Sequence, residues 1–238
     1  MDEAGILERL LLFGLTRQEA SIYICLFMKG SLTGYEVSKQ TGISRSNVYS
    51  GLSGLVDKGA AYLMEGTANK YIAVPVEEFC NNKIRTMNTQ KDFLIKNMPA
   101  MEVSSEGYIT IEGAKNIRNR ILNMLEKATQ RIYLSAPEIF IKSVEQELEE
   151  VVSRKIKVVL ITDKKTGVKG ALEYLSEKKE DQLRLIIDSV YVLTGDIGGE
   201  SSDTCLYSGQ RNFVNVFKEA LHNEIKLIEL TNGEKNYE

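Results

Sequence analysis

The side chains best suited to chemistry lie on a short helix that the sequence predicts between Ser44 and Lys58. An apolar stripe at helical spacing consists of Val48, Leu52, Leu55 and Val56. The opposite face carries Ser46, Ser50 and Ser53, with Asn47 and Tyr49 on its flanks. Such a helix suits the major groove of DNA, where short polar groups can contact phosphates and base edges. Because helix pairs are common, a small helical hairpin within any domain is the alternative interpretation.

The segment before this helix contains the signals that would position it. Thr33 and Glu36 form a capping-box pattern, which predicts the start of a preceding helix. Gly42 predicts the end of that helix because glycine adopts positive φ at little cost, and Ser44 can cap the next one. Together these residues predict a helix-turn-helix. Two packing helices are expected upstream, at residues 3–13 and, after a second capping box, at residues 16–29.

The periodicity changes from helical to alternating after Gly59. Residues 61–64 and 70–74 read as two strands joined by a short loop, which predicts a β-hairpin. A hairpin directly after such a helix is the winged form of the helix-turn-helix. Asn69 and Lys70 provide a donor and a positive charge that suit a DNA phosphate. For Lys70, a solvated surface lysine is the alternative.

A long helix is predicted from Glu77 to Met98, between Pro75 and Pro99. A seam with alternating steps of four and three residues runs through Cys80, Ile84, Met87, Lys91, Leu94 and Met98. This spacing is typical of a coiled-coil dimer, although the seam is short and contains a lysine. We expect a homodimer through this linker helix. A helix that lies on its own chain is the alternative.

Strands and helices alternate in the rest of the chain, which predicts an α/β domain with a mixed sheet. The expected strands are 108–111, 131–135, 156–162, 183–187, 191–194 and 204–207. The expected helices are 112–127, 140–154, 169–178 and a last one from Arg211. The predicted organisation is therefore a winged domain at 1–75, a linker helix at 76–102 and an α/β domain at 103–238.

Composition restricts the classes of protein without selecting one. The formal net charge is −3, and residues 1–102 carry 11 basic and 11 acidic side chains, so DNA binding would depend on local placement of charge. Cys25, Cys80 and Cys205 lack metal-ligand spacing and are expected to be free thiols. No metal or cofactor is expected. Without an apolar run of about 18 residues or a signal-peptide pattern, we expect no membrane partner and a cytoplasmic location.

Four segments resemble the TrmB family of transcriptional regulators. They are FGLTRQEASIY at 13–23, GISRSNVY at 42–49, LVDKG at 55–59 and KYIAVPVEEF at 70–79. The resemblance implies a dimeric repressor or activator that binds double-stranded DNA. It also implies that the start of the second helix contacts DNA. The full expected set is Ser44, Arg45, Ser46, Asn47, Tyr49, Ser50, Asn69 and Lys70.

The wing departs from the family pattern. Thr67-Ala68-Asn69 stands where an Arg-Pro pair usually precedes the Lys-Tyr motif, so strong insertion of the wing into the minor groove is not expected. An interaction module that binds only proteins is a further alternative, but the exposed face is rich in hydroxyl groups rather than the large anchors typical of such interfaces.

The second half is similar to the phospholipase-D-like fold attached to such regulators. Active enzymes of that fold use a His-x-Lys motif, and the corresponding region at 188–196 contains neither residue. The single histidine, His222, lies in the last predicted helix without that context. Because the chemistry needs both the nucleophile and the phosphate-binding cation, we expect no catalytic residue. The alternative is a phosphodiesterase-like enzyme whose winged domain docks partners.

A small-molecule effector, such as a sugar or another metabolite, would bind at the carboxyl ends of the strands in an α/β sheet. The residues at those ends are Ser135, Glu138, Asp163, Thr194 and Asp196. The competing interpretation gives this domain a role in dimerisation alone.

Overall fold

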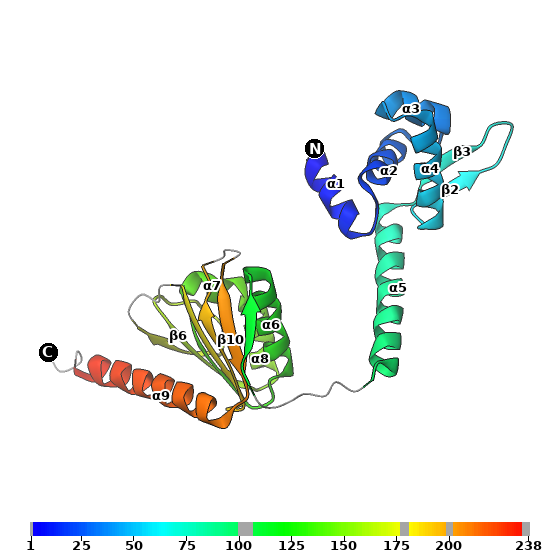
Figure 1. The fold of residues 1–238 in the computed structure, drawn as a ribbon. Coiled ribbons are helices and arrows are strands. Elements are labelled where there is room, and N and C mark those ends of the chain that lie inside the picture. Colours follow the sequence, from blue (N-terminus) through cyan, green and yellow to red (C-terminus); the bar gives the residue numbers. More distant parts are fainter. Residues whose placement is uncertain (1, 100–106, 177–180, 199–201, 235–238) are drawn as a thin grey trace. The chain divides into compact units, whose positions relative to one another are not determined.

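The computed structural model describes residues 2–99, 107–176, 181–198 and 202–234. Contacts divide the chain into two compact units, Met1–Met101 and Glu102–Glu238. Figure 1 shows both units, each with its own secondary structure. Among the described residues, the buried apolar side chains form three hydrophobic clusters, one in the first unit and two in the second. No helix among the described residues is long and apolar enough to span a membrane.

The first unit contains the expected helix-turn-helix with its wing. Its elements are α1 (Glu3–Leu12), α2 (Arg17–Lys29), β1 (Leu32–Thr33), α3 (Gly34–Thr41), α4 (Arg45–Asp57), β2 (Ala61–Met64), β3 (Lys70–Ala73) and α5 (Val76–Asn97). Both predicted capping boxes form, at Thr16 and Thr33. Gly42 ends α3 with a φ of 71°, as its position predicts.

The core of the first unit is built around Tyr23 of α2. Its hydroxyl donates a hydrogen bond of 2.8 Å to the Val74 carbonyl, which joins α2 to the end of the wing. Phe79, in the first turns of α5, packs its ring on Tyr23 and on Phe13. Val48 and other members of the predicted apolar stripe of α4 are fully buried against this core. The aromatic cluster therefore anchors the start of α5.

A three-stranded sheet in the order β1-β3-β2 completes the wing. The hairpin of β2 and β3 was expected, but β1 was not. Its two residues are too few to produce a sequence period, and its pairing with β3 depends on the tertiary fold. Thr33 is both the last residue of β1 and the N-cap of α3, so the sheet fixes where α3 starts.

Most of α5 beyond Phe79 is exposed, including the predicted seam from Ile84 onward, whereas the first predicted seam residue, Cys80, packs against the core of its own unit. Ile84, Met87 and Leu94 are 50%, 58% and 54% exposed. Beyond Cys80 the helix therefore presents an apolar stripe that the described part of its own unit leaves exposed. The part of the predicted linker beyond residue 99 lies outside the described residues.

The second unit is a seven-stranded mixed sheet in the order β4-β10-β9-β8-β5-β6-β7. Its strands are β4 (Ile109–Glu112), β5 (Arg131–Ser135), β6 (Lys157–Thr162), β7 (Leu172–Leu175), β8 (Gln182–Ile187), β9 (Tyr191–Asp196) and β10 (Thr204–Ser208). Its helices are α6 (Ala114–Lys127), α7 (Glu138–Ser143), α8 (Glu145–Ser153) and α9 (Arg211–Glu234). The predicted mixed α/β class is confirmed.

The helices cover the two faces of this sheet unequally (Figure 1). Residues of α6, α7 and α8 pack with Leu134, Leu160 and Leu185 in the larger hydrophobic cluster. Val214 and Leu221 of α9 pack with Ile161 and Ile186 in a smaller cluster on the opposite face. One face is therefore covered by three helices and the other by a single helix.

Two predicted helices are wrong in this unit. The segment predicted as a helix at 169–178 contains strand β7, whose residues 172–175 pair in parallel with β6; residues 177 and 178 lie outside the described part. Apolar Leu172 and Leu175 are three residues apart, which fits a helix as well as a strand. The segment 140–154 contains parts of two helices, α7 and α8, separated at Val144, whose φ of −125° is not helical.

Candidate nucleic-acid interface

The exposed face of α4 collects the predicted DNA-contact residues of the helix-turn-helix. Val48, Gly51, Leu52 and Leu55 are buried beneath it. The exposed residues are Ser44, Arg45, Ser46, Asn47, Tyr49, Ser50 and Ser53. Burial of one stripe fixes the rotation of the helix, so the remaining polar residues must face away from the core. The structure brings the helical part of the predicted set together on one surface.

Ser44 occupies the N-cap position of α4 but makes no side-chain capping hydrogen bond, contrary to the sequence-based expectation. Its Oγ lies 3.3 Å from Oγ of Ser46 instead. The two hydroxyls therefore form a pair at the exposed start of α4. The unsatisfied backbone N–H groups in this first turn are suited to a phosphate.

Two contacts from the start of α3 orient side chains of α4, and sequence reasoning missed both. The guanidinium carbon of Arg45 lies 4.6 Å from the ring centroid of Tyr35, a cation–π contact between two exposed side chains. The Tyr49 ring lies directly on the backbone of Gly34, because a Cβ built there would be 2.6 Å from Cε1 of Tyr49. The sequence offered only one signal for these contacts, the pair Gly34-Tyr35 directly after the capping residue Thr33.

A partly buried ion pair holds the other end of α4. Nζ of Lys58 lies 2.6 Å from Oε2 of Glu19, which also accepts a 2.7 Å hydrogen bond from the Thr16 backbone N–H. Burial would raise the pKa of Glu19, but the hydrogen bonds from Lys58 and Thr16 outweigh it and hold that pKa below its ordinary value. The N-terminus of α2 is thereby tied to the C-terminus of α4.

The wing places Lys70 at the start of β3, in register with Thr33 of β1. Lys70 is exposed, and so is Asn69 before it. The pKa of Glu36 is lowered mainly by hydrogen bonds from Thr33 and, in smaller part, by the charge of Lys70. The charge of Lys70 therefore has only a small effect on the α3 cap.

The residues predicted to bind an effector lie at one edge of the large sheet. β5 and β9 run in the same direction because each is antiparallel to β8. Ser135 and Thr194 are in register with the same residue, Arg184, on either side of it. Ser135 is buried and Asp196 is exposed. Their binding role stays a prediction.

Two of these predicted effector residues have structural partners. A carboxylate oxygen of Asp163 accepts a 2.8 Å hydrogen bond from the backbone N–H of Glu138 at the start of α7. This hydrogen bond is the main reason that the pKa of Asp163 is lowered. The Glu138 carboxylate forms an ion pair with Lys142 one turn later. Both side chains therefore stabilise the start of α7.

The region that would correspond to a His-x-Lys motif has a structural acid instead. The Asp188 carboxylate accepts hydrogen bonds from the backbone N–H groups of Thr129, Gln130 and Arg131 and from the Thr129 hydroxyl. His222 is exposed on α9, as part of a different element. Within the described residues, no group of three histidine, cysteine or acidic side chains is placed to hold a metal ion.

Two family models match separate parts of the chain. The model described as "Sugar-specific transcriptional regulator TrmB" matches residues 10–77. The model described as the N-terminal subdomain of the EBD of transcriptional regulator TrmB matches residues 107–219. The first match contains α2, α3, α4 and the wing, and the second contains the large sheet.

Curated relatives match a large part of this chain. YrhO of Bacillus subtilis is 28% identical over 149 residues, which cover 61% of this chain and 54% of YrhO. TrmBL1 of Pyrococcus furiosus, an HTH-type sugar sensing transcriptional regulator, is 28% identical over 155 residues, covering 63% of this chain and 46% of TrmBL1. The chain thus spans about half the length of these two relatives.

Solved structures show lower similarity. TrmBL2, an archaeal chromatin protein, is matched at a TM-score of 0.42 and 22% identity over 94% of this chain and 98% of that one. Nuc of Salmonella typhimurium, a phospholipase D family member, is matched at a TM-score of 0.43 and 14% identity over 49% of this chain and 92% of that one.

Proposed function

The chain belongs to the TrmB family of transcriptional regulators, and from this premise we propose that it binds double-stranded DNA sequence-specifically as a homodimer. The observation that carries the proposal is the exposed polar face of α4, whose apolar side is buried in the winged core. The buried stripe makes the polar residues available to a partner, and their chemistry suits base edges and phosphates.

The predicted contact residues on this face have separate proposed roles. Arg45, Ser46 and Asn47 read bases or adjacent phosphates, because they lie at the start of α4, the end that a recognition helix directs into the groove. Ser44, Tyr49 and Ser50 position the DNA backbone. The contact with Tyr35 holds Arg45 in place before DNA arrives, which reduces the entropy lost when the arginine binds.

The wing has a smaller proposed role than the helix. Asn69 and Lys70 contact the DNA backbone. The wing also lacks the Arg-Pro pair that usually precedes the Lys-Tyr motif, since Thr67-Ala68-Asn69 stands there. We expect modest affinity for a single winged head and strong dependence on binding two half-sites.

Dimerisation is proposed to occur through α5. Ile84, Met87 and Leu94 form an exposed stripe at coiled-coil spacing on a helix of 22 residues. A second copy of the helix would bury this stripe and would place two winged heads on one DNA molecule. Lys91 lies in the same seam and can extend its charged end out of it.

The second unit is proposed to sense a small molecule and to lack catalytic activity. The sugar-sensing role of TrmBL1 supports the first part. The absence of histidine and lysine from residues 188–196 supports the second. A phosphodiesterase is the alternative function, and hydrolysis of bis(p-nitrophenyl) phosphate by the full chain, lost when His222 is changed to alanine, would favour it.

DNA binding can be tested with the full chain and its own upstream DNA. The double variant Arg45→Ala, Asn47→Ala should lose about 2–4 kcal/mol of specific binding, since each bidentate base contact contributes about 1–3 kcal/mol. Arg17→Ala is the matched control, because Arg17 pairs only with exposed Glu8 on the described surface. Unchanged specific binding by the double variant would refute the site assignment. Equal binding of promoter and random DNA would refute the regulator.

A further inference from the structure

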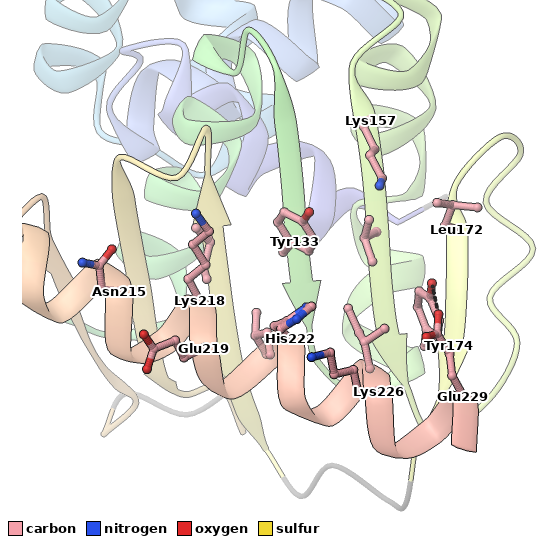
Figure 2. Close-up of a pocket in the computed structure, with 14 residues that line it drawn as sticks. Tyr133, Lys157, Leu172, Tyr174, Asn215, Lys218, Glu219, His222, Lys226 and Glu229 are labelled. Carbon is pink, nitrogen blue, oxygen red and sulfur yellow. Dashed lines mark hydrogen bonds between the residues drawn. The ribbon is translucent and has the colours of Figure 1, made fainter. Parts of the chain in front are cut away.

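The sheet face that carries α9 contains a hollow that the predicted effector residues do not line. Its volume is about 600 Å³, and it lies between α9 and strands β5, β6, β7 and β8. Figure 2 shows this hollow with Tyr133 and Lys157 on the sheet side and His222 and Lys226 on the helix side. Cavities of roughly 300–1,000 Å³ are the usual size for small-molecule sites.

The floor of the hollow is apolar. Val159 and Ile186 of the sheet are buried there, and Leu221 and Ile225 of α9 close the side of the helix. Tyr133, whose ring packs against the smaller hydrophobic cluster, is only partly buried. The floor can therefore take up the body of an aliphatic or aromatic molecule and gain the free energy of removing apolar surface from water.

The rim of the hollow is cationic. Lys157, Lys218 and Lys226 line it, and none of them forms an ion pair with another described residue. Of the two acidic residues in the lining, Glu229 accepts a 3.0 Å hydrogen bond from the Tyr174 hydroxyl. Figure 2 shows the other, Glu219, directed away from the centre.

A further positive charge lies on the same face. Arg131 is the register partner of Lys157, and side chains of a strand alternate between faces. Arg131 is therefore on the same face as Tyr133, two residues before it at the start of β5. An apolar floor below several unpaired cations favours a ligand with an apolar body and a negative group, and it disfavours a metal ion or an organic cation.

We propose that this hollow binds a small organic anion, a molecule with an apolar body and a carboxylate or phosphate group. The Lys157 and Lys226 ammonium groups supply positive charge for the anionic group, one from the sheet and one from the helix (Figure 2). Val159 and Ile186 contact the apolar body. The assignment of this hollow as the effector site of the regulator rests on the proposed function. Binding of the anion itself does not require DNA.

A ligand here would touch two elements that are far apart in the sequence. α9 packs on the sheet through one row of apolar residues, including Leu221, and the hollow lies along one side of that row. An anion attracted by both Lys157 of β6 and Lys226 of α9 would favour closer packing of the helix on the sheet. The position of α9 is thus the property that ligand binding would change.

The experiment uses the full chain without DNA and the fluorescent aromatic anion 8-anilinonaphthalene-1-sulfonate. We expect saturable binding at one site per chain, weakened about tenfold for each lysine removed in Lys157→Gln and Lys226→Gln. Lys115→Gln with Lys169→Gln is the matched control, because both lysines are exposed and outside this hollow. All four positions are exposed, so the variants should fold.

Competition identifies the anionic group. Phenyl phosphate and benzoate separate phosphate from carboxylate, and benzamide is the neutral reference. Displacement by either anion but not by benzamide supports the proposal. Displacement by neither anion, equal displacement by benzamide, or equal binding of the probe to the lysine variants and the wild type overturns it. Because no DNA is present, failure here leaves the proposed regulator intact, whereas failure of promoter binding leaves this site intact.

Discussion

The ion pair between Glu19 and Lys58 offers a direct test of how α4 is positioned. Glu19→Gln keeps the shape of the side chain but removes its charge. Glu19 is 7% exposed, and its carboxylate accepts hydrogen bonds from both the Lys58 ammonium and the Thr16 N–H. Hydrogen bonds to a charged group contribute about 1.5–3 kcal/mol, and Lys58 is partly exposed, so we expect a loss of about 2 kcal/mol.

The loss should be local to the winged head. Hydrogen exchange measured on peptides of α2 and α4 separates this unit from the second one, which a single unfolding curve would not do. Exchange in α4 should become about 30-fold faster, since 1.4 kcal/mol corresponds to a factor of about ten. Lys58→Met completes a double-mutant cycle that isolates the pair. Each single variant should lose most of the stabilisation that the pair provides, so the double variant should be little less stable than either one.

The same carboxylate gives a pH dependence with a defined sign. Because the pKa of Glu19 is lower in the folded state than its ordinary value of 4.5, the unfolded chain binds the proton first. The stabilisation is therefore complete above pH 4.5 and is lost as the pH falls below it through the folded value. Glu19→Gln should remove this component of acid sensitivity. If the variant protects α4 as well as the wild type at pH 7, the pair does not position the helix.

Further predictions concern both units and the dimer. Asp188→Ala should destabilise the second unit by about 2–4 kcal/mol, because three backbone N–H groups lose an acceptor; urea unfolding at pH 7 measures this. Since the pKa of Asp188 is lowered from 3.8, its contribution should be present above that pH and fade below it. Gly34→Val should displace Tyr49 and weaken DNA binding at least several-fold in a fluorescence-anisotropy titration, while α3 and α4 still form by circular dichroism. Leu94→Glu should shift the full chain from dimer to monomer in sedimentation velocity without loss of helix, because Leu94 is already exposed in one chain.

Local signals in the sequence predicted the winged head well. Thr16 and Thr33 formed their capping boxes, and Gly42 took the positive φ that its position required. These are short-range interactions that a few neighbouring residues determine. The apolar stripe of α4 also predicted which of its faces would be buried, because helical spacing alone decides that.

Tertiary contacts account for what the sequence did not reveal. The pairing of Leu172–Leu175 with β6 depends on a neighbouring strand, and spacing within the segment could not distinguish it from a helix. The stacking of Arg45 on Tyr35 joins residues ten positions apart through a turn. The hollow beside α9 combines residues from five elements of the second unit, and no linear motif contains them.

The charge of the winged head explains why its geometry matters. Basic and acidic side chains are equal in number over residues 1–102, so non-specific attraction to DNA phosphates is weak. Lys58 is engaged by Glu19. Arg45 lies at the exposed start of α4 and stacks on Tyr35. Specificity in such a head must come from placing a few side chains accurately, which requires α4 to be held at both ends.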